Sequence, residues 1–282
     1  MATKPLVILV TGASSGIGAA AVRALLREGH SVYAGARRVE RMAELERAGA
    51  RLLALDVTDE ASMTTAVSRI AAEQGRIDVL VNNAGYGSYG ALEDVPLEEG
   101  RRQFDVNVFG LARMTQLVLP HMRAQRSGRI VNVSSMGGKI YEPCGCWYHA
   151  SKFAVEGLSD CLRLELREFD IHVIVIQPGG IATEWGGIAA RGLLETSGST
   201  AYADIARTEA ALLAAGQADA GGSDPAVIGK LIARAIRAPR PATRYCGGAG
   251  AMPFLLARKW LSDRAFDWLM LTLARTFAQR QR

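Results

Sequence analysis

The chain has 282 residues, of which 49% are hydrophobic and 22% charged, ordinary values for a globular protein with a large core. The net charge is +5, but the basic residues are scattered along the chain, so no nucleic-acid partner is expected. No stretch of about 18 uncharged apolar residues occurs, so no membrane span is expected.

The start of the chain has the pattern of a strand rather than that of an export signal. Residues 6–10 form a short apolar run that leads directly into a glycine-rich turn. The spacing of the four cysteines, at positions 144, 146, 161 and 246, fits neither a disulfide framework nor a zinc site. We therefore expect free thiols, no bound metal and a cytoplasmic location.

Strand patterns alternate with helical patterns up to about residue 180. Strands are expected at 6–10, 31–36, 51–55, 78–81, 129–133 and 171–177, with an alanine-rich helix ending near Gly29 and others near 39–48, 59–74, 97–124 and 147–168. Strands joined through helices predict right-handed crossovers and a parallel, doubly wound α/β sheet of the Rossmann type. We expect a single domain over residues 1–282.

The pattern changes beyond Thr183. Residues 184–223 are rich in glycine, alanine and serine, with a weak helical stretch at 202–215, and are predicted to form a mobile lid over the ligand crevice. A short helix is expected at 225–236, followed by an irregular or extended stretch at 240–249. Residues 252–282 are predicted to form an amphipathic tail that packs on the domain or a partner subunit, with contact to a membrane surface as the weaker alternative.

The turn after the first strand has the composition of a dinucleotide site. A helix that starts at such a turn presents unpaired N–H groups and a positive dipole end to a pyrophosphate. Gly12, Gly16 and Gly18 have the spacing G-x-x-x-G-x-G rather than the commoner G-x-G-x-x-G. Ser14, Ser15 and Ile17 complete the set of expected cofactor-binding residues in this turn.

The end of the second strand indicates the type of nucleotide. Sites for NAD usually place an acidic residue there to bind the ribose 2′-hydroxyl. Ala36 occupies that place and is followed by Arg37 and Arg38, whose guanidinium groups suit a 2′-phosphate. The cofactor is therefore expected to be NADP, or NADPH in its reduced form.

Six motifs, taken together and in order, resemble the short-chain dehydrogenase/reductase family over residues 5–185. They are Thr11-Gly-x-x-x-Gly-x-Gly18, Asn82-Asn-Ala-Gly85, Asn107, Ser135, Tyr148-x-x-x-Lys152, and Pro178-Gly179 with Ile181 and Thr183. The arginine pair and the apolar tail resemble the NADP-preferring carbonyl reductases and hydroxysteroid dehydrogenases of that family.

The resemblance implies further contacts and roles. It implies that Asp56, Val57, Asn83, Ala84 and Gly85 contact the adenosine half of the cofactor, and that Pro178, Gly179, Ile181 and Thr183 lie beside the nicotinamide half. Lys152 would bind the nicotinamide ribose, and Asn107 would anchor a chain of waters that relays protons to solvent. The helices at 97–124 and 147–168 resemble the family's dimer-forming pair, so a homodimer or homotetramer is expected.

The proposed catalytic residues are Asn107, Ser135, Tyr148 and Lys152. Tyr148 and Lys152 are four residues apart and share one helix face. A nearby ammonium would lower the pKa of the phenol toward neutrality, so that Tyr148 can act as acid and base. Ser135 would hydrogen-bond the substrate oxygen and align it with Tyr148.

The substrate is expected to be a lipophilic ketone or secondary alcohol, steroid-like or aromatic. This expectation depends on the apolar or aromatic candidates for the pocket wall, which are Tyr86, Met136, Tyr141, Trp147, Trp185 and lid residues near Leu193 and Leu194. Cys144 and Cys146 are small wall residues that could also face the substrate. Two alternatives stay open: a reductase of 3-oxoacyl thioesters, and a non-catalytic NADP-sensing protein, although proteins of the latter kind tend to lose the Tyr/Lys pair.

Overall fold

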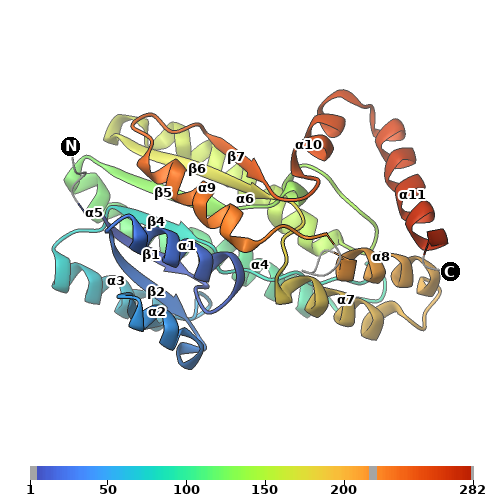
Figure 1. Ribbon diagram of the computed structural model, residues 1–282, viewed down its shortest axis with the longest axis horizontal. Helices are drawn as coiled ribbons and strands as arrows, with labels where there is room; N and C mark the ends of the chain where they lie inside the picture. The colour runs from blue at the N-terminus through green and yellow to red at the C-terminus, as the bar shows by residue number, and fades with distance from the viewer. Residues whose placement is uncertain (1–4, 216–220, 281–282) are drawn as a thin grey trace.

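The structure is a computed structural model that describes residues 5–215 and 221–280. Seven strands form one parallel sheet in the order β3-β2-β1-β4-β5-β6-β7 (Figure 1). They are β1 (Val7–Thr11), β2 (Ser31–Ala36), β3 (Arg51–Ala54), β4 (Val79–Asn82), β5 (Gly128–Val133), β6 (Ile171–Pro178) and β7 (Arg244–Gly247). The order reverses between β1 and β4, which confirms the doubly wound Rossmann-type fold.

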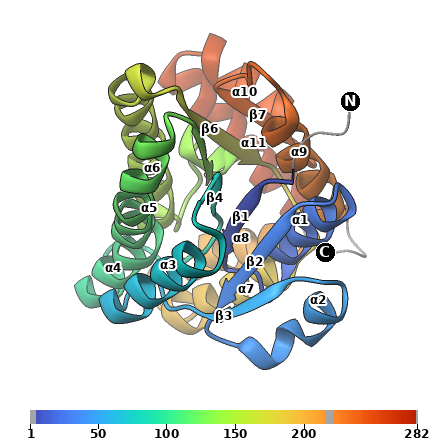
Figure 2. The same cartoon turned by 90° about the vertical axis from the view of Figure 1, so that its left-hand side faces the viewer.

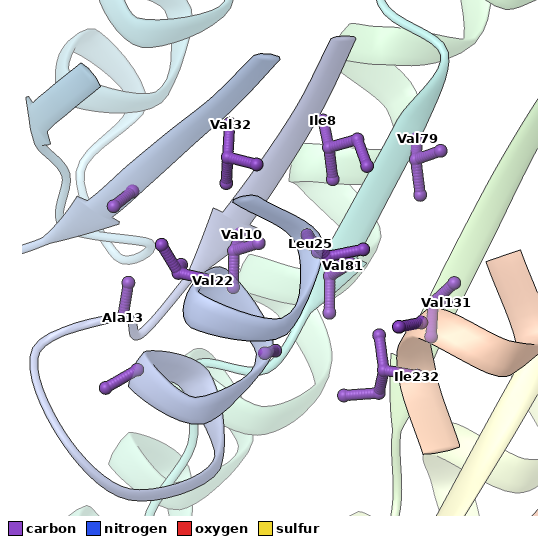
Figure 3. Packing of buried hydrophobic residues seen from close by; sticks show 14 of the residues in the cluster. Ile8, Val10, Ala13, Val22, Leu25, Val32, Val79, Val81, Val131 and Ile232 are labelled. Atoms are coloured by element: carbon purple, nitrogen blue, oxygen red, sulfur yellow. The ribbon is translucent and has the colours of Figure 1, made fainter. Parts of the chain in front are cut away.

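Helices cover both faces of the sheet (Figure 2). One face carries α1 (Gly16–Arg27), α2 (Ala43–Arg47) and α9 (Pro225–Arg237), and the other carries α3 (Glu60–Gln74), α5 (Leu111–Gln125) and α6 (Cys146–Glu165). Successive side chains of a strand point to opposite faces, so Ile8 and Val10 pack under α1 and α9 while Leu9 packs under α3 and α5. Figure 3 shows the first of these layers, where Ile8, Val10, Leu25 and Ile232 are fully buried.

The helix predicted at 97–124 is observed as one continuous helical segment with an irregular middle. α4 (Leu97–Phe104) passes through a π-helical turn at Asp105–Gly110 into α5. Turns of this kind are rare and occur often at functional sites. Here the π-helical turn carries Asn107, one of the proposed catalytic residues.

The predicted lid is more helical than its composition indicated. It consists of α7 (Glu184–Ser197) and α8 (Ala203–Ala215), which pack against each other, and α7 was not expected because its glycines lower helix propensity. The close packing of α7 on α8 requires glycine at position 186, since a Cβ there would lie 2.6 Å from the Leu213 carbonyl oxygen. The predicted extended stretch at 240–249 contains β7, which pairs with β6.

The predicted tail forms two helices, α10 (Ala251–Trp260) and α11 (Asp263–Arg280). α10 starts beside β7 and α11 returns to α8 (Figure 1). The Phe266 side chain is fully buried, whereas Trp260 and Trp268 remain 77% and 69% exposed. The tail thus packs on the lid through one stripe, and no helix in the described residues is long and apolar enough to cross a membrane.

Candidate active site at the carboxyl ends of the strands

A cavity of about 600 Å³ lies at the carboxyl ends of the central strands. Its walls come from the glycine-rich turn after β1, the loops after β2, β4, β5 and β6, and the lid helices α7 and α8. In an open parallel sheet, this crevice beside the reversal of strand order is where ligands bind. Most of the predicted site residues meet there.

The glycine-rich turn packs closely against the loop after β4. Gly12 and Gly16 have left-handed φ angles of +67° and +52°, and a Cβ on Gly12 would lie 2.7 Å from the Ala84 Cα. Gly18 does not line the cavity; a Cβ there would lie 2.3 Å from the Gly12 carbonyl oxygen, so its role is to let the turn close. Ser14, Ser15, Gly16 and Ile17 line the cavity at the start of α1.

Asn83 and Thr11 fasten this turn to the loop after β4. The Asn83 side-chain amide donates to the Thr11 and Gly12 carbonyl oxygens at 3.0 and 3.1 Å. The Thr11 hydroxyl in turn accepts hydrogen bonds from the backbone N–H groups of Asn83 and Ala84, both at 3.0 Å. Thr11 was part of the recognised motif but was not among the predicted site residues, and its positioning role emerges only from the structure.

The two arginines after β2 have different surroundings. Both line the cavity, together with Asp56 and Val57. Arg38 donates to Glu184 of α7 at 3.1 Å, and Arg41, which the sequence did not indicate, binds the same carboxylate through both of its terminal nitrogens. These contacts, chiefly that of Arg41, lower the pKa of Glu184 to about 2. Arg37 has no carboxylate partner in residues 5–215 and 221–280.

Tyr148 lies in the first turn of α6, with its ring packed between aromatic side chains. The ring centroids of Tyr89 and Trp185 lie 5.6 and 5.1 Å from that of Tyr148. Burial raises the pKa of Tyr148 to about 12, although a hydrogen bond with Ser135 acts in the opposite direction. The expectation of a lowered pKa was therefore wrong for this structure, because desolvation outweighs the polar contacts.

Lys152 lies on the same face of α6 as Tyr148, and its ammonium group binds the end of β5. Its Nζ donates to the Val133 carbonyl oxygen at 3.0 Å, at the end of β5. Burial lowers the pKa of Lys152 to about 8, while the charge of Glu156 opposes this shift. Lys152 thus lines the cavity next to Gly85, where it can donate to a bound ribose.

Asn107 supports the site from behind rather than lining it. Its Oδ1 accepts the Tyr86 backbone N–H at 3.1 Å, and its Nδ2 donates to the Tyr86 carbonyl oxygen and to Ser151 Oγ, both at 3.0 Å. The π-helical turn places this side chain between the loop after β4 and α6. Asn107 is therefore a positioning residue in this structure, and its proposed role in a water chain stays a prediction.

The predicted substrate residues divide into two groups. Tyr86, Met136 and Trp185 line the cavity, but Tyr141 and Trp147 do not. Tyr141 donates to Asp267 of α11 at 2.9 Å, and Trp147 packs edge-on against Phe104 of α4. Both predictions were wrong because these side chains point away from Tyr148 to neighbouring helices.

Other residues complete the substrate end of the cavity. Leu193 is fully buried and Leu194 is 43% exposed, and neither lines the cavity, whereas Ile188 on the same lid helix does. Cys144 and Cys146 do not line it either; Cys144 is buried and Cys146 is exposed. The lining residues that the sequence did not indicate include Tyr89, Glu142, His149, Ile188, Glu209, Leu212 and Leu213.

The family model for short chain dehydrogenases matches residues 6–190. The chain belongs to the short-chain dehydrogenase/reductase family. It is 38% identical to a 3-ketodihydrosphingosine reductase of Bacteroides thetaiotaomicron over 95% of this chain and 97% of that protein. It is 36% identical to mouse 17-beta-hydroxysteroid dehydrogenase type 1 over 92% of this chain and 78% of the mouse protein.

Solved structures of the family have the same architecture. A short-chain dehydrogenase from Streptomyces avermitilis superimposes with a TM-score of 0.80 at 33% identity, covering 97% of this chain and 98% of that one. The closed form of a serine dehydrogenase complexed with NADP+ superimposes with a TM-score of 0.74 at 27% identity, covering 86% and 94%. The chain is therefore an NAD(P)-dependent oxidoreductase that acts on a carbonyl or alcohol group of a small molecule.

Proposed function

We propose that this member of the family uses NADPH to reduce a lipophilic ketone to a secondary alcohol. The observation that carries this proposal is one continuous cavity that runs from Arg37 and the glycine-rich turn to Ser135 and Tyr148. The pyrophosphate would bind at the start of α1, where N–H groups and the helix dipole favour an anion. Arg37 would bind the 2′-phosphate, since it lines the cavity at the end of β2, where an acidic residue would favour NAD.

When bound, the reduced nicotinamide supplies the hydride. Ser135 would donate a hydrogen bond to the substrate carbonyl oxygen and hold it beside the Tyr148 hydroxyl. Tyr148 then transfers its proton to the oxygen as the alkoxide forms. Lys152 would bind the ribose and add positive charge beneath the cavity. Asn107 fixes Tyr86 and α6, and therefore the position of Tyr148 relative to the loop after β4.

The substrate end of the cavity favours a lipophilic molecule. Its walls include Met136, Trp185, Ile188, Leu212 and Leu213. Two relatives over most of the chain are a 3-ketodihydrosphingosine reductase and a 17-beta-hydroxysteroid dehydrogenase, names that support the same substrate class.

The first test is a pair of fluorescence titrations of the purified protein with NADPH and NADH, followed by a panel of aliphatic, aromatic and steroid ketones. We expect tighter binding of NADPH and consumption of NADPH with lipophilic ketones. Tighter binding of NADH would contradict the cofactor assignment. A lack of turnover over the whole panel would contradict the substrate class.

Glu184 offers a separate test of the phosphate site. Its carboxylate neutralises Arg38 and Arg41 beside the place proposed for the 2′-phosphate. Glu184→Gln should therefore lower the Kd for NADPH about threefold, the size of a partly exposed charge effect, and change that for NADH less. Weaker NADPH binding in the titration would show instead that the Glu184 carboxylate holds Arg38 and Arg41 in position for the phosphate.

We also propose that the protein is a homodimer or homotetramer that associates through the helices from α4 to α6. Phe109, Phe153 and Leu164 are exposed there by 60%, 43% and 70%. Phe153→Glu should shift sedimentation at micromolar concentration toward the monomer, whereas Trp268→Glu on α11 should not. A monomeric wild-type protein would refute the association itself.

A further inference from the structure

Glu209 is a buried carboxyl group on the wall of the proposed catalytic cavity. It lies on α8 between Ala206 and Ala210, which pack in one cluster with Tyr89, Cys144 and Tyr148. Its exposed fraction is 2%, and it lines the cavity. Within the described parts of the chain, no donor hydrogen-bonds to it and no cation pairs with it.

Such a position costs folding free energy. Burial and the nearby charge of Glu142 raise the pKa of Glu209 to about 8, so the unliganded carboxyl is mostly protonated at neutral pH. A buried polar group with a structural role has a partner. A leucine or methionine would fill this place on α8 with no desolvation penalty, so the unpartnered carboxyl indicates a ligand.

A second carboxyl group lies at the same end of the cavity. Glu142 accepts a hydrogen bond from the Tyr89 hydroxyl at 2.8 Å and lies 3.8 Å from His149 Nε2. Although burial opposes ionisation, these two neighbours lower the pKa of Glu142, so it is a carboxylate. The Glu142 and Glu209 carboxyls therefore form an acidic wall at this end of the cavity.

His149 lies beside Glu142 at the same end of the cavity. Its exposed fraction is 6%, and its Nδ1 donates to the Gly137 carbonyl oxygen at 2.8 Å. Its Nε2 lies 3.8 Å from Glu142, so the imidazole supports that carboxylate and adds no acceptor of its own to the cavity. Two buried carboxyl groups thus offer acceptors to a ligand at this end of the cavity.

We propose that this acidic wall binds a protonated amine of the substrate, so that the enzyme acts on amino ketones and amino alcohols. An ammonium group has three donors and no acceptor, which complements the carboxyl groups of Glu142 and Glu209. The faces of Trp185 and Tyr89 in the same cavity suit a cation as well. This inference rests on the proposed function and adds a charge requirement to it.

The catalytic test compares alcohols as substrates for oxidation by NADP+. The probes are aliphatic secondary alcohols of about ten to twelve carbons, roughly the size that a cavity of this kind holds. Each carries a primary amine one, two or three carbons from the carbinol carbon. The comparison compounds are the same alcohols without the amine. Glu209→Gln should lower kcat/KM for the preferred amino alcohol by about 10- to 100-fold, as expected for hydrogen bonds to a charged group. The loss for the plain alcohols should be much smaller, because they carry no ammonium for Glu209 to bind.

Glu195→Gln is the matched control, since Glu195 is an exposed carboxylate on α7. It should leave both classes of alcohol unchanged. If Glu209→Gln lowers kcat/KM equally for amino alcohols and plain alcohols, Glu209 only stabilises the packing of the lid helices. No loss in either class would also overturn the inference, although turnover of the plain alcohols would leave the proposed function intact.

A binding measurement decides the question without turnover. The titratable groups that face Glu209 are Glu142, Cys144, Tyr89, Tyr148 and His149. At pH 7, hexylamine should bind and expel close to one proton, because the ammonium replaces the proton of Glu209. Isothermal titration calorimetry in two buffers of different ionisation enthalpy measures that release.

Hexanol should release no proton in the same titration, and Glu209→Gln should abolish the release by hexylamine. If hexylamine binds no better than hexanol, the ammonium site is refuted even for an active enzyme. If hexylamine binds as described but the wild-type protein oxidises no alcohol and reduces no ketone, the proposed function fails and the ammonium site stands.

Discussion

Replacing Tyr148 with phenylalanine is expected to lower kcat for ketone reduction by roughly 10³-fold, the loss typical of a missing general acid. The change removes only the hydroxyl, so the ring keeps its contacts with Tyr89 and Trp185 and the lid keeps its packing. The Kd for NADPH, measured by fluorescence titration, should stay within about twofold, as for a distant substitution. A steady-state assay with a lipophilic ketone measures the loss.

Tyr89→Phe is the matched control for this variant. Tyr89 packs against Tyr148 and its hydroxyl binds Glu142, so the substitution removes a buried hydroxyl from the same aromatic cluster. Its effect on kcat should be much smaller than that of Tyr148→Phe, because the lost hydrogen bond is made to Glu142 and not to the substrate oxygen. Comparable losses in the two variants, or substantial residual activity in Tyr148→Phe, would remove Tyr148 from the role of proton donor.

The raised pKa of Tyr148 also bears on the direction of the reaction. Because burial holds this pKa near 12, the side chain is a phenol at neutral pH and can donate a proton. Alcohol oxidation needs the phenolate, so kcat for oxidation should rise with pH up to at least pH 9, while kcat for reduction stays flat. A flat profile for oxidation in stopped-flow or steady-state assays would place the proton acceptor elsewhere.

Local patterns predicted the fold and the cofactor half of the site. The continuous apolar runs of β1, β4 and β6 have the composition of strands covered on both faces. Parallel strands end at one edge of the sheet, so motifs that follow different strands had to meet there. Gly12, Asn83, Ser135 and Thr183 accordingly line one cavity, although they come from four separate parts of the chain.

The substrate half was harder to predict because it depends on helix orientation. Tyr141 and Trp147 flank Tyr148 in sequence, yet each side chain packs on a different helix, α11 and α4. Local composition does not encode that choice. Leu212 and Leu213 had a signal, since they lie on the apolar side of the expected 202–215 helix. Glu142 and Glu209 had none, because charged residues on loops and helices are normally solvent-exposed.

The second large effect is expected for Arg37→Ala. This arginine lies on the cavity wall after β2, and among the residues of known placement it has no carboxylate partner, in contrast to Arg38. Its guanidinium is therefore free to bind a 2′-phosphate through charge-assisted hydrogen bonds. The variant should raise the Kd for NADPH about 10- to 100-fold. The Kd for NADH should change little, because that cofactor carries no phosphate there.

Arg47→Ala on α2 removes the same charge from an exposed position outside the cavity and serves as the control. It should change the two dissociation constants equally and by less than about twofold, the size of a screened long-range charge effect. The decisive quantity is the ratio of the two constants, since a general loss of positive charge or a disturbed β2 loop weakens both cofactors. If Arg37→Ala leaves that ratio unchanged, the phosphate must be recognised by Arg38, which would then have to exchange Glu184 for the cofactor.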